Sequence, residues 1–412
     1  MTTMPPPQPG IMDIALYQGG ASKIEGQENP LKLSSNENPF GCSPLASAAV
    51  SAAALGMHRY PSTDHADLRA AIAGVHKLAA ERIICGVGSD ELLTLLAMAF
   101  AGPGDEVLYP EHGFSMYRIF ALSAGATPVT APEKDRRVDV DALIARITDR
   151  TRLIYIANPA NPTGTALESD DLARLAAAVP SECLLVLDGA YAEFAHGYDG
   201  GAALVDRHPN VVMTRTFSKL YGLGGLRVGW AYAAQSVIDV LNRVRGPFNL
   251  STVAIAGAEA AMRDRAFAEQ CIEDNAEQRV RLTGGLRQLG IACDDSAANF
   301  VLARFADEDE ALAADAHLKS SGILVRLVKG YGFPEALRIT VGSAEDVTRV
   351  LAALAAFRGR YERHLQPCGS DWPGPDRLLD VLGHETRGPR GGGHRVCPQQ
   401  CHPRHRAPDR AV

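Results

Sequence analysis

A lysine follows an apolar run near the middle of the chain. Lys219 stands in Thr216-Phe217-Ser218-Lys219, directly after the run at 211–213. An ammonium group at the end of a buried strand needs a partner or a chemical role, because burying an unpaired charge is costly. The hydroxyls of Thr216 and Ser218 and the glycines that follow suit a loop that approaches a phosphate, which the planar fork of Arg227 could clamp. Alone, the pattern fits a solvated lysine in a glycine-rich loop equally well.

A carboxylate ends the wholly apolar run Leu184-Leu185-Val186-Leu187-Asp188. Ligands of parallel sheets bind at the carboxyl ends of the strands. A buried aspartate at that edge suits a cation, and a pyridinium nitrogen is one. Tyr191 could donate its hydroxyl to the phenolic oxygen of the same ring. The alternatives are a helix N-cap for Asp188 and ordinary packing for Tyr191.

Two more turns fall at the ends of expected strands. In Asn158-Pro159-Ala160-Asn161-Pro162-Thr163-Gly164, the two X-Pro steps force an extended, turning loop that places Asn161 to bond a cofactor oxygen. Gly86-Val87-Gly88-Ser89-Asp90-Glu91 links a strand to a helix whose free N–H groups, with Ser89, form an anion site. A dinucleotide fingerprint is the rival interpretation, and Glu91 stands where its third glycine belongs.

The elements around these residues alternate between short apolar runs and amphipathic stretches. Strands are expected at 82–87, 106–109, 153–157, 184–188, 211–216 and 227–233, with helices at 90–101, 115–124 and 169–179. This alternation predicts an α/β fold with a mainly parallel sheet flanked by helices.

The pattern changes after about residue 245. A helical region at 251–289 is followed by expected strands at 299–304, 324–327 and 337–340 and a last helix at 344–361, which favours a smaller α+β domain. We expect an N-terminal arm and part of the small domain at 1–45, a large domain at 46–245, a small domain at 246–362, and a disordered tail at 363–412. The large and small domains should meet near 243–249.

Composition excludes several classes of protein. The chain has 412 residues, a net charge of −7 and eight cysteines, which argues against a nucleic-acid-binding stripe and a disulfide scaffold. We see no membrane-spanning run and no secretory signal, and expect a cytoplasmic protein. Some tail residues could imitate a metal site, but their spacing matches no usual zinc signature, so we expect no metal: His394, Cys397, Cys401, His402 and His405.

Taken together and in chain order, these motifs resemble the fold-type-I aminotransferases over residues 13 to 360. Four segments resemble the histidinol-phosphate aminotransferase family within that superfamily. They are 32–41 (KLSSNENPFG), 58–61 (HRYP), 216–222 (TFSKLYG) and 337–342 (LRITVG).

The resemblance implies pyridoxal 5′-phosphate carried as a Schiff base on Lys219. It implies that Phe114 stacks on the pyridine ring, and that Tyr60 reaches the cofactor phosphate across the interface of a homodimer. Further cofactor contacts are implied for Ser89, Asp90, Asn161, Asp188, Tyr191, Thr216, Ser218 and Arg227.

The implied reaction is a ping-pong transfer between histidinol phosphate and 2-oxoglutarate, giving imidazole acetol phosphate and glutamate, in histidine biosynthesis. The resemblance places Tyr17 and Asn38 near the substrate. Arginine forks suit both phosphate and carboxylate, so Arg338 and then Arg326 are the candidate anion clamps; a surface ion pair is the alternative for Arg326. An aromatic-amino-acid aminotransferase or a threonine-phosphate decarboxylase would share almost all of these residues. A catalytically silent binding protein is the alternative from another class, and it would have no need for all five of Lys219, Asp188, Asn161, Tyr191 and Arg227.

Overall fold

Seven strands lie side by side in the order β2-β10-β9-β8-β7-β3-β4 in the computed structural model of the chain, which describes residues 5–17 and 19–365. They are β2 (Ile83–Gly86), β3 (Glu106–Pro110), β4 (Thr127–Ala131), β7 (Thr151–Ala157), β8 (Leu184–Asp188), β9 (Val211–Thr216) and β10 (Gly229–Tyr232). Only β10 runs antiparallel to its neighbours in this sheet. The mainly parallel sheet of the predicted fold class is therefore confirmed.

Helices cover both faces of this sheet, because its central strands are apolar on both sides. Along β8, Leu185 and Leu187 pack into the core shared with α2, α5, α6 and α7, while Leu184 and Val186 pack into the core shared with α3, α4 and α8. The helices are α2 (Ala66–His76), α3 (Gly88–Phe100), α4 (Met116–Ser123), α5 (Val140–Arg146), α6 (Ser169–Ala178), α7 (Ala202–Arg207) and α8 (Gln235–Val244). A parallel sheet buried on both faces leaves the ends of its strands as the places where polar side chains can gather.

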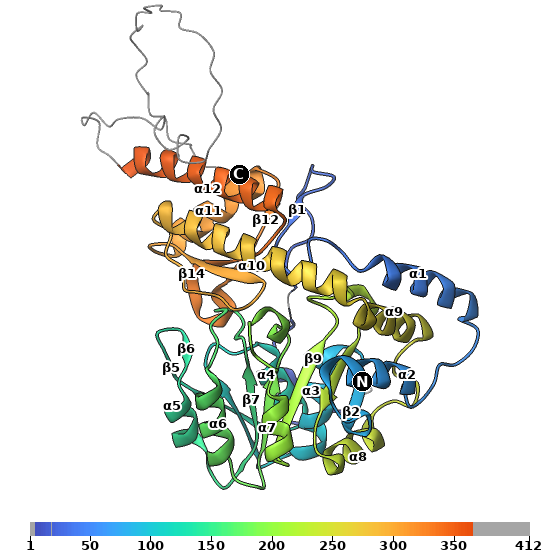
Figure 1. The fold of residues 1–412 in the computed structure, drawn as a ribbon. Coiled ribbons are helices and arrows are strands. Elements are labelled where there is room, and N and C mark those ends of the chain that lie inside the picture. The colour runs from blue at the N-terminus through green and yellow to red at the C-terminus, as the bar shows by residue number, and fades with distance from the viewer. Residues whose placement is uncertain (1–4, 18, 366–412) are drawn as a thin grey trace, which may run out of the picture. The chain divides into compact units, whose positions relative to one another are not determined.

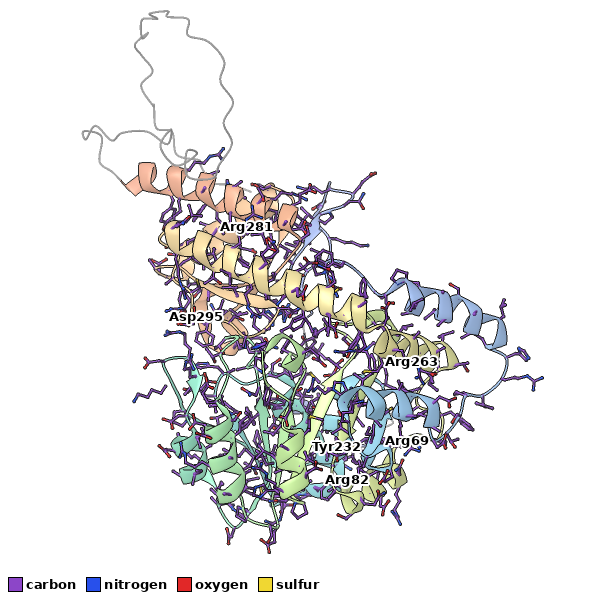
Figure 2. The ribbon with its side chains drawn as sticks, in the orientation of Figure 1. Arg69, Arg82, Tyr232, Arg263, Arg281 and Asp295 are labelled. Carbon is purple, nitrogen blue, oxygen red and sulfur yellow. The ribbon has the colours of Figure 1, made fainter. Side chains whose placement is uncertain are left out.

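The amino-terminal end of β2 carries a cluster with a structural role. Arg82, labelled in Figure 2, lies over the ring of Tyr232 at 4.5 Å from its centroid. Both side chains bond the Asp206 carboxylate, at 2.7 Å from Arg82 and 2.8 Å from Tyr232. The Arg82 guanidinium and the Asp206 carboxylate pair with each other, so this cluster links β2, β10 and α7.

A second, antiparallel sheet has the order β11-β14-β13 and lies with α10 and α11 in the upper part of Figure 1. Its elements and the remaining ones are β11 (Phe300–Arg304), β13 (Arg326–Val328), β14 (Phe333–Thr340), α1 (Pro44–Ala53), α9 (Thr252–Arg263), α10 (Arg265–Gln288), α11 (Glu308–Ser320) and α12 (Ala344–Leu365). The short strand β1 (Leu31–Lys32) pairs in parallel with β12 (Ile323–Leu324), and β5 (Glu133–Lys134) forms a hairpin with β6 (Arg137–Val138). Six short 3₁₀ turns complete the described part: η1 (Ile11–Asp13), η2 (Ala54–Gly56), η3 (Ala80–Arg82), η4 (Ala192–Phe194), η5 (Gly224–Leu226) and η6 (Lys329–Tyr331).

Three predicted elements are wrong in their extent. The strand expected at 337–340 is the second half of the longer β14, which begins at Phe333. The helical region at 251–289 is two helices, because Asp264 leaves the helical conformation and its carboxylate accepts the Phe267 N–H that begins α10. The strand expected at 324–327 is divided at Val325 into β12 and β13, which pair with strands of different sheets.

The described residues up to Arg360 belong to one compact unit. The division into arm, large domain and small domain stays a prediction. Of the expected tail at 363–412, residues 366–412 lie outside the described residues, and so do all five of its histidines and cysteines that could imitate a metal site. No helix in the described part of the chain is long and apolar enough to cross a membrane.

Candidate active site

Side chains from the carboxyl ends of five strands line one cavity of about 240 Å³. Asp188 ends β8, and Lys219 and Asn161 follow β9 and β7. Helix α3 begins just after β2, and Phe114 follows β3. The parallel sheet thus brings together residues that are far apart in the sequence.

All but two of the predicted site residues line this cavity. Those that do are Tyr17, Ser89, Asp90, Phe114, Asn161, Asp188, Tyr191, Thr216, Ser218, Lys219, Arg227, Arg326 and Arg338. The two that do not are Tyr60 and Asn38.

Tyr60 is 82% exposed and stacks on Phe248, with 4.4 Å between the ring centroids. The structure contains a single chain, so the expected contact of Tyr60 with the cofactor phosphate across a dimer interface stays a prediction. Asn38 lies beside a separate, smaller pocket. Its Nδ2 donates to the Leu220 carbonyl and its Oδ1 accepts from the Phe40 N–H, so its side chain holds the loop that follows Lys219.

Asp188 is a buried acid whose partners are hydrogen-bond donors. Its carboxylate accepts from the Tyr117 hydroxyl at 2.9 Å, the Ala190 N–H at 3.2 Å and the Thr214 hydroxyl at 3.4 Å. Within the described part of the chain it is paired with no basic side chain. Burial raises its pKa to about 6, against these hydrogen bonds, which lower it. The site therefore favours an added cation beside Asp188.

Lys219 projects its amine into the same cavity. Its Nζ donates to the Ser35 carbonyl at 3.1 Å and lies 5.8 Å from the centroid of the Tyr191 ring. Burial, and then the positive charge of Arg338, lower the pKa of Lys219 to about 8. A neutral amine is a nucleophile and a base, so this shift suits a lysine with a chemical role.

One corner of the cavity is built to receive an anion. Helix α3 begins at Gly88 with no side-chain cap among the described residues, which leaves its first N–H groups for another acceptor, and Ser89 and Asp90 of its first turn line the cavity. Arg227 donates to the Ser218 hydroxyl at 3.1 Å and to the Asp90 carboxylate at 3.2 Å. A Cβ on Gly88 would lie 2.6 Å from Nη2 of Arg227, so glycine is what allows this close approach.

A second cationic group lies on β14. Arg338 is buried and donates to the Asn161 side chain and to the Ser34 carbonyl, while its Nε has no hydrogen-bond partner among residues 5–17 and 19–365. Arg326 pairs opposite Arg338 in the register of β13 and β14, and both line the cavity. Two neighbouring guanidinium groups favour an anionic ligand between or beside them.

Several residues that line the cavity or hold its polar groups in place were not predicted from the sequence. Tyr117 and Thr214 bond Asp188 from α4 and β9, and Ser34, Ser35 and Asn36 contact Arg338, Lys219 and Tyr191. The alternation of β9 could have found Thr214, which lies two residues before Thr216 and so on the same face. Tyr117 gave no signal beyond its place on an amphipathic helix.

The model of the family described as aminotransferase class I and II matches residues 28–354. The chain belongs to the class I and II aminotransferases. It is 80% identical to the histidinol-phosphate aminotransferase of Roseobacter denitrificans over 85% of this chain and 98% of the relative. It is 65% identical to the enzyme of the same name from Jannaschia sp., over 87% and 99%.

Solved structures agree on the fold. The histidinol-phosphate aminotransferase of Sinorhizobium meliloti, crystallised in complex with pyridoxal-5′-phosphate, is 27% identical with a TM-score of 0.80, over 87% of this chain and 99% of that one. The Thermus thermophilus aspartate aminotransferase with maleate matches with a TM-score of 0.70 at 24% identity, over 80% and 92%. The aminotransferase described here therefore has the predicted fold-type-I architecture.

The cavity of this aminotransferase fits pyridoxal phosphate part by part. Asp188 offers a buried carboxylate to a ring nitrogen, the Gly88–Arg227 corner offers donors to a phosphate, and Lys219 offers an amine to an aldehyde. In the described residues no group of three or more metal-binding side chains gathers.

Proposed function

We propose that this aminotransferase exchanges an amino group between histidinol phosphate and 2-oxoglutarate, with pyridoxal phosphate held on Lys219. The observation that carries the proposal is that Lys219 shares one cavity with Asp188, a buried carboxylate that no basic side chain of the described residues pairs, and with two arginines, Arg227 and Arg338. The high identity to relatives named histidinol-phosphate aminotransferase supports the substrate.

Each part of the cofactor would have its own residues. Asp188 would hold the ring nitrogen, Asn161 and Tyr191 the phenolic oxygen, and Phe114 would stack on the ring face. Ser89, Asp90, Thr216, Ser218 and Arg227 would surround the phosphate. When bound, pyridoxal phosphate supplies an electron sink that stabilises negative charge at the α-carbon of the substrate.

Lys219 would move the proton of the reaction. With a pKa lowered to about 8, about a tenth of the free Lys219 amine is neutral at pH 7, and that neutral form can accept the α-proton of the substrate. The protonated amine can then return that proton to a neighbouring carbon. One residue thus serves as base and acid in turn.

The arginines would recognise both substrates of the ping-pong cycle. Histidinol phosphate carries a phosphate ester and glutamate carries carboxylates, and a guanidinium fork binds both kinds of oxyanion. Arg338 lines the cavity, and the Asn161 side chain and the Ser34 carbonyl hold its guanidinium there. Arg326, opposite it in register, and Tyr17 would complete the substrate side.

The cofactor is tested with the purified protein and pyridoxal phosphate. A visible absorption band should appear, and borohydride followed by peptide mass spectrometry should leave the cofactor attached to Lys219. Lys219→Ala should abolish both, while the exposed Lys329→Ala should change neither. A protein that stays colourless after incubation with the cofactor would contradict the proposal.

The substrate is tested by comparing kcat/KM for histidinol phosphate, phenylalanine and glutamate. We expect histidinol phosphate to be preferred over phenylalanine. A preference for phenylalanine would instead identify an aromatic-amino-acid aminotransferase, and release of carbon dioxide from threonine phosphate would identify a decarboxylase.

We also propose that the enzyme is a cytoplasmic homodimer in which Tyr60 reaches the cofactor phosphate of the partner. The exposure of Tyr60, Phe248, Leu55 and Met57 supports such an interface. Mixing inactive Tyr60→Ala and Lys219→Ala chains should restore part of the activity, because one of the mixed sites has both residues. No recovery after confirmed subunit exchange would contradict the shared site.

A further inference from the structure

Asn36 is a buried residue in the segment that follows β1, and it belongs to none of the strands of the main sheet. It is 1% exposed and has a φ of 57°, in the left-handed region that asparagine tolerates better than most residues. Its neighbours Ser34 and Ser35 bond Arg338 and Lys219 through their carbonyls. Asn36 itself bonds Tyr191, so one short segment contacts three polar groups of the active site.

Four hydrogen bonds fix the position of Asn36. Its N–H donates to the Thr340 hydroxyl at 3.0 Å, and that hydroxyl donates to Oδ1 of Asn36 at 3.2 Å. Its carbonyl accepts from Nδ2 of Asn299 at 3.0 Å, and its own Nδ2 donates to the Tyr191 hydroxyl at 3.0 Å. Because Thr340 occupies Oδ1, the donor end of the amide faces Tyr191.

This orientation determines what Tyr191 can do. A tyrosine hydroxyl has one hydrogen and lone pairs that accept. The Asn36 amide takes up an acceptor position, so the hydroxyl hydrogen is left for another partner, and Tyr191 lines the cavity. Burial raises the pKa of Tyr191, so the hydroxyl keeps that hydrogen near neutral pH.

We propose that Asn36 is a positioning residue that turns the hydroxyl hydrogen of Tyr191 into the cavity, where it donates to the phenolic oxygen of the cofactor. The inference rests on the proposed function, because it assumes that pyridoxal phosphate occupies this cavity. With the opposite amide orientation, Tyr191 would donate to Asn36 and could only accept from the cavity side. The two arrangements predict changes of opposite sign.

The test is a pH titration of the visible band of the protein loaded with pyridoxal phosphate. A donor to the phenolic oxygen stabilises its negative charge and so makes proton uptake by the bound cofactor harder. Tyr191→Phe removes that donor and should raise the apparent pKa of the band by about one unit. Arg338, Asp188 and Asp90 also act on Tyr191 by their charge, equally in every variant.

Asn36→Gly is the decisive variant, because glycine adopts a φ of 57° without strain and the substitution removes the side chain whose amide donates to Tyr191. It should raise the apparent pKa in the same direction as Tyr191→Phe, and the double variant should titrate like Tyr191→Phe alone, since Asn36 acts through Tyr191. Thr340→Val, which frees the amide, should give a smaller rise. Lys77→Gly, another left-handed position at the end of α2, should leave the titration unchanged.

Three results separate the possible failures. If Asn36→Gly and Thr340→Val titrate like the unchanged protein or lower the apparent pKa, Asn36 does not orient Tyr191 in the proposed sense. Fully additive shifts in the double variant would also overturn the inference. If the unchanged protein develops no visible band, the proposed function itself fails.

Discussion

Asp188 and Glu193 are two buried carboxylates close together in the sequence, and their surroundings differ. Glu193 lies 3.1 Å from Arg215, and both side chains are almost fully buried. Asp188, at the end of β8, has only hydrogen-bond donors beside it among the described residues, and burial raises its pKa to about 6. A buried acid that its own chain neutralises holds the fold together, whereas one that is left without a cation is prepared for a ligand.

The largest expected effect is the loss of catalytic rate caused by Asp188→Asn. Loss of the carboxylate removes the stabilisation of the ring cation, so kcat should fall roughly 10²- to 10³-fold. Steady-state kinetics at saturating pyridoxal phosphate measures this effect. A kcat within a few-fold of the unchanged enzyme would mean that Asp188 is a structural residue like Glu193.

Glu193→Gln should show the opposite pattern. It leaves the Arg215 guanidinium buried without its counter-charge, so the free energy of unfolding should fall by about 3 kcal/mol while kcat of the folded enzyme changes little. Urea unfolding measures the loss. Asp141→Asn, which breaks an exposed ion pair with Arg174, is the matched control and should cost less than about 1 kcal/mol. An equal loss of unfolding free energy in the two variants would show that the buried Glu193–Arg215 pair matters no more to stability than the exposed Asp141–Arg174 pair.

The main sheet could be predicted from the sequence because its strands are short, apolar and separated by amphipathic helices. The run ending in Asp188 is a strand with the predicted bounds, and Lys219, Asn161 and Asp188 follow strands whose carboxyl ends meet by geometry. Strand β4 (Thr127–Ala131) was not predicted, because it lies at the edge of the sheet and alternates weakly in burial.

The supporting contacts of the site could not be predicted in this way. The bond from Tyr117 to Asp188 joins a helix to a strand, and the bond from Asn36 to Tyr191 joins the N-terminal segment to the main sheet. Such contacts depend on how separate elements pack, and no local pattern in the sequence records them. The segment 32–41 resembles a family motif, but that resemblance assigns no role to Asn36.

A smaller effect should appear in the pH dependence of stability without cofactor. The pKa of Asp188 is raised from about 3.8 in the unfolded chain to about 6, so the folded protein binds more protons between these values and loses stability as pH rises through them. The amide that replaces the carboxylate in Asp188→Asn does not titrate, so this variant does not lose that stability as the pH rises. Relative to the unchanged protein, it should therefore gain roughly 2 to 3 kcal/mol in unfolding free energy between pH 4 and pH 8.

Parallel unfolding curves of the two proteins at several pH values measure that gain. Adding pyridoxal phosphate at pH 8 should reverse the order, because the cofactor then supplies the missing cation. A stability difference that does not change with pH would show that the Asp188 carboxylate is not destabilised by its burial.

The smallest expected effect is on cofactor binding at the corner of the cavity that contains Gly88 and Arg227. This corner is suited to an anion, whereas Asp188 is suited to a cation. Gly88 has a φ of 75°, and a Cβ there would lie 2.6 Å from Nη2 of Arg227. Gly88→Ala should weaken the binding of pyridoxal phosphate about tenfold, since it strains the start of α3 and displaces a phosphate ligand. Absorbance titration gives the Kd, and Gly284→Ala, at a helical glycine with open space around it, is the control that should leave the Kd unchanged. Because Asp188 is untouched, the pH titration of the bound cofactor should stay the same in Gly88→Ala, so an altered titration would mean that the two ends of the site are not independent.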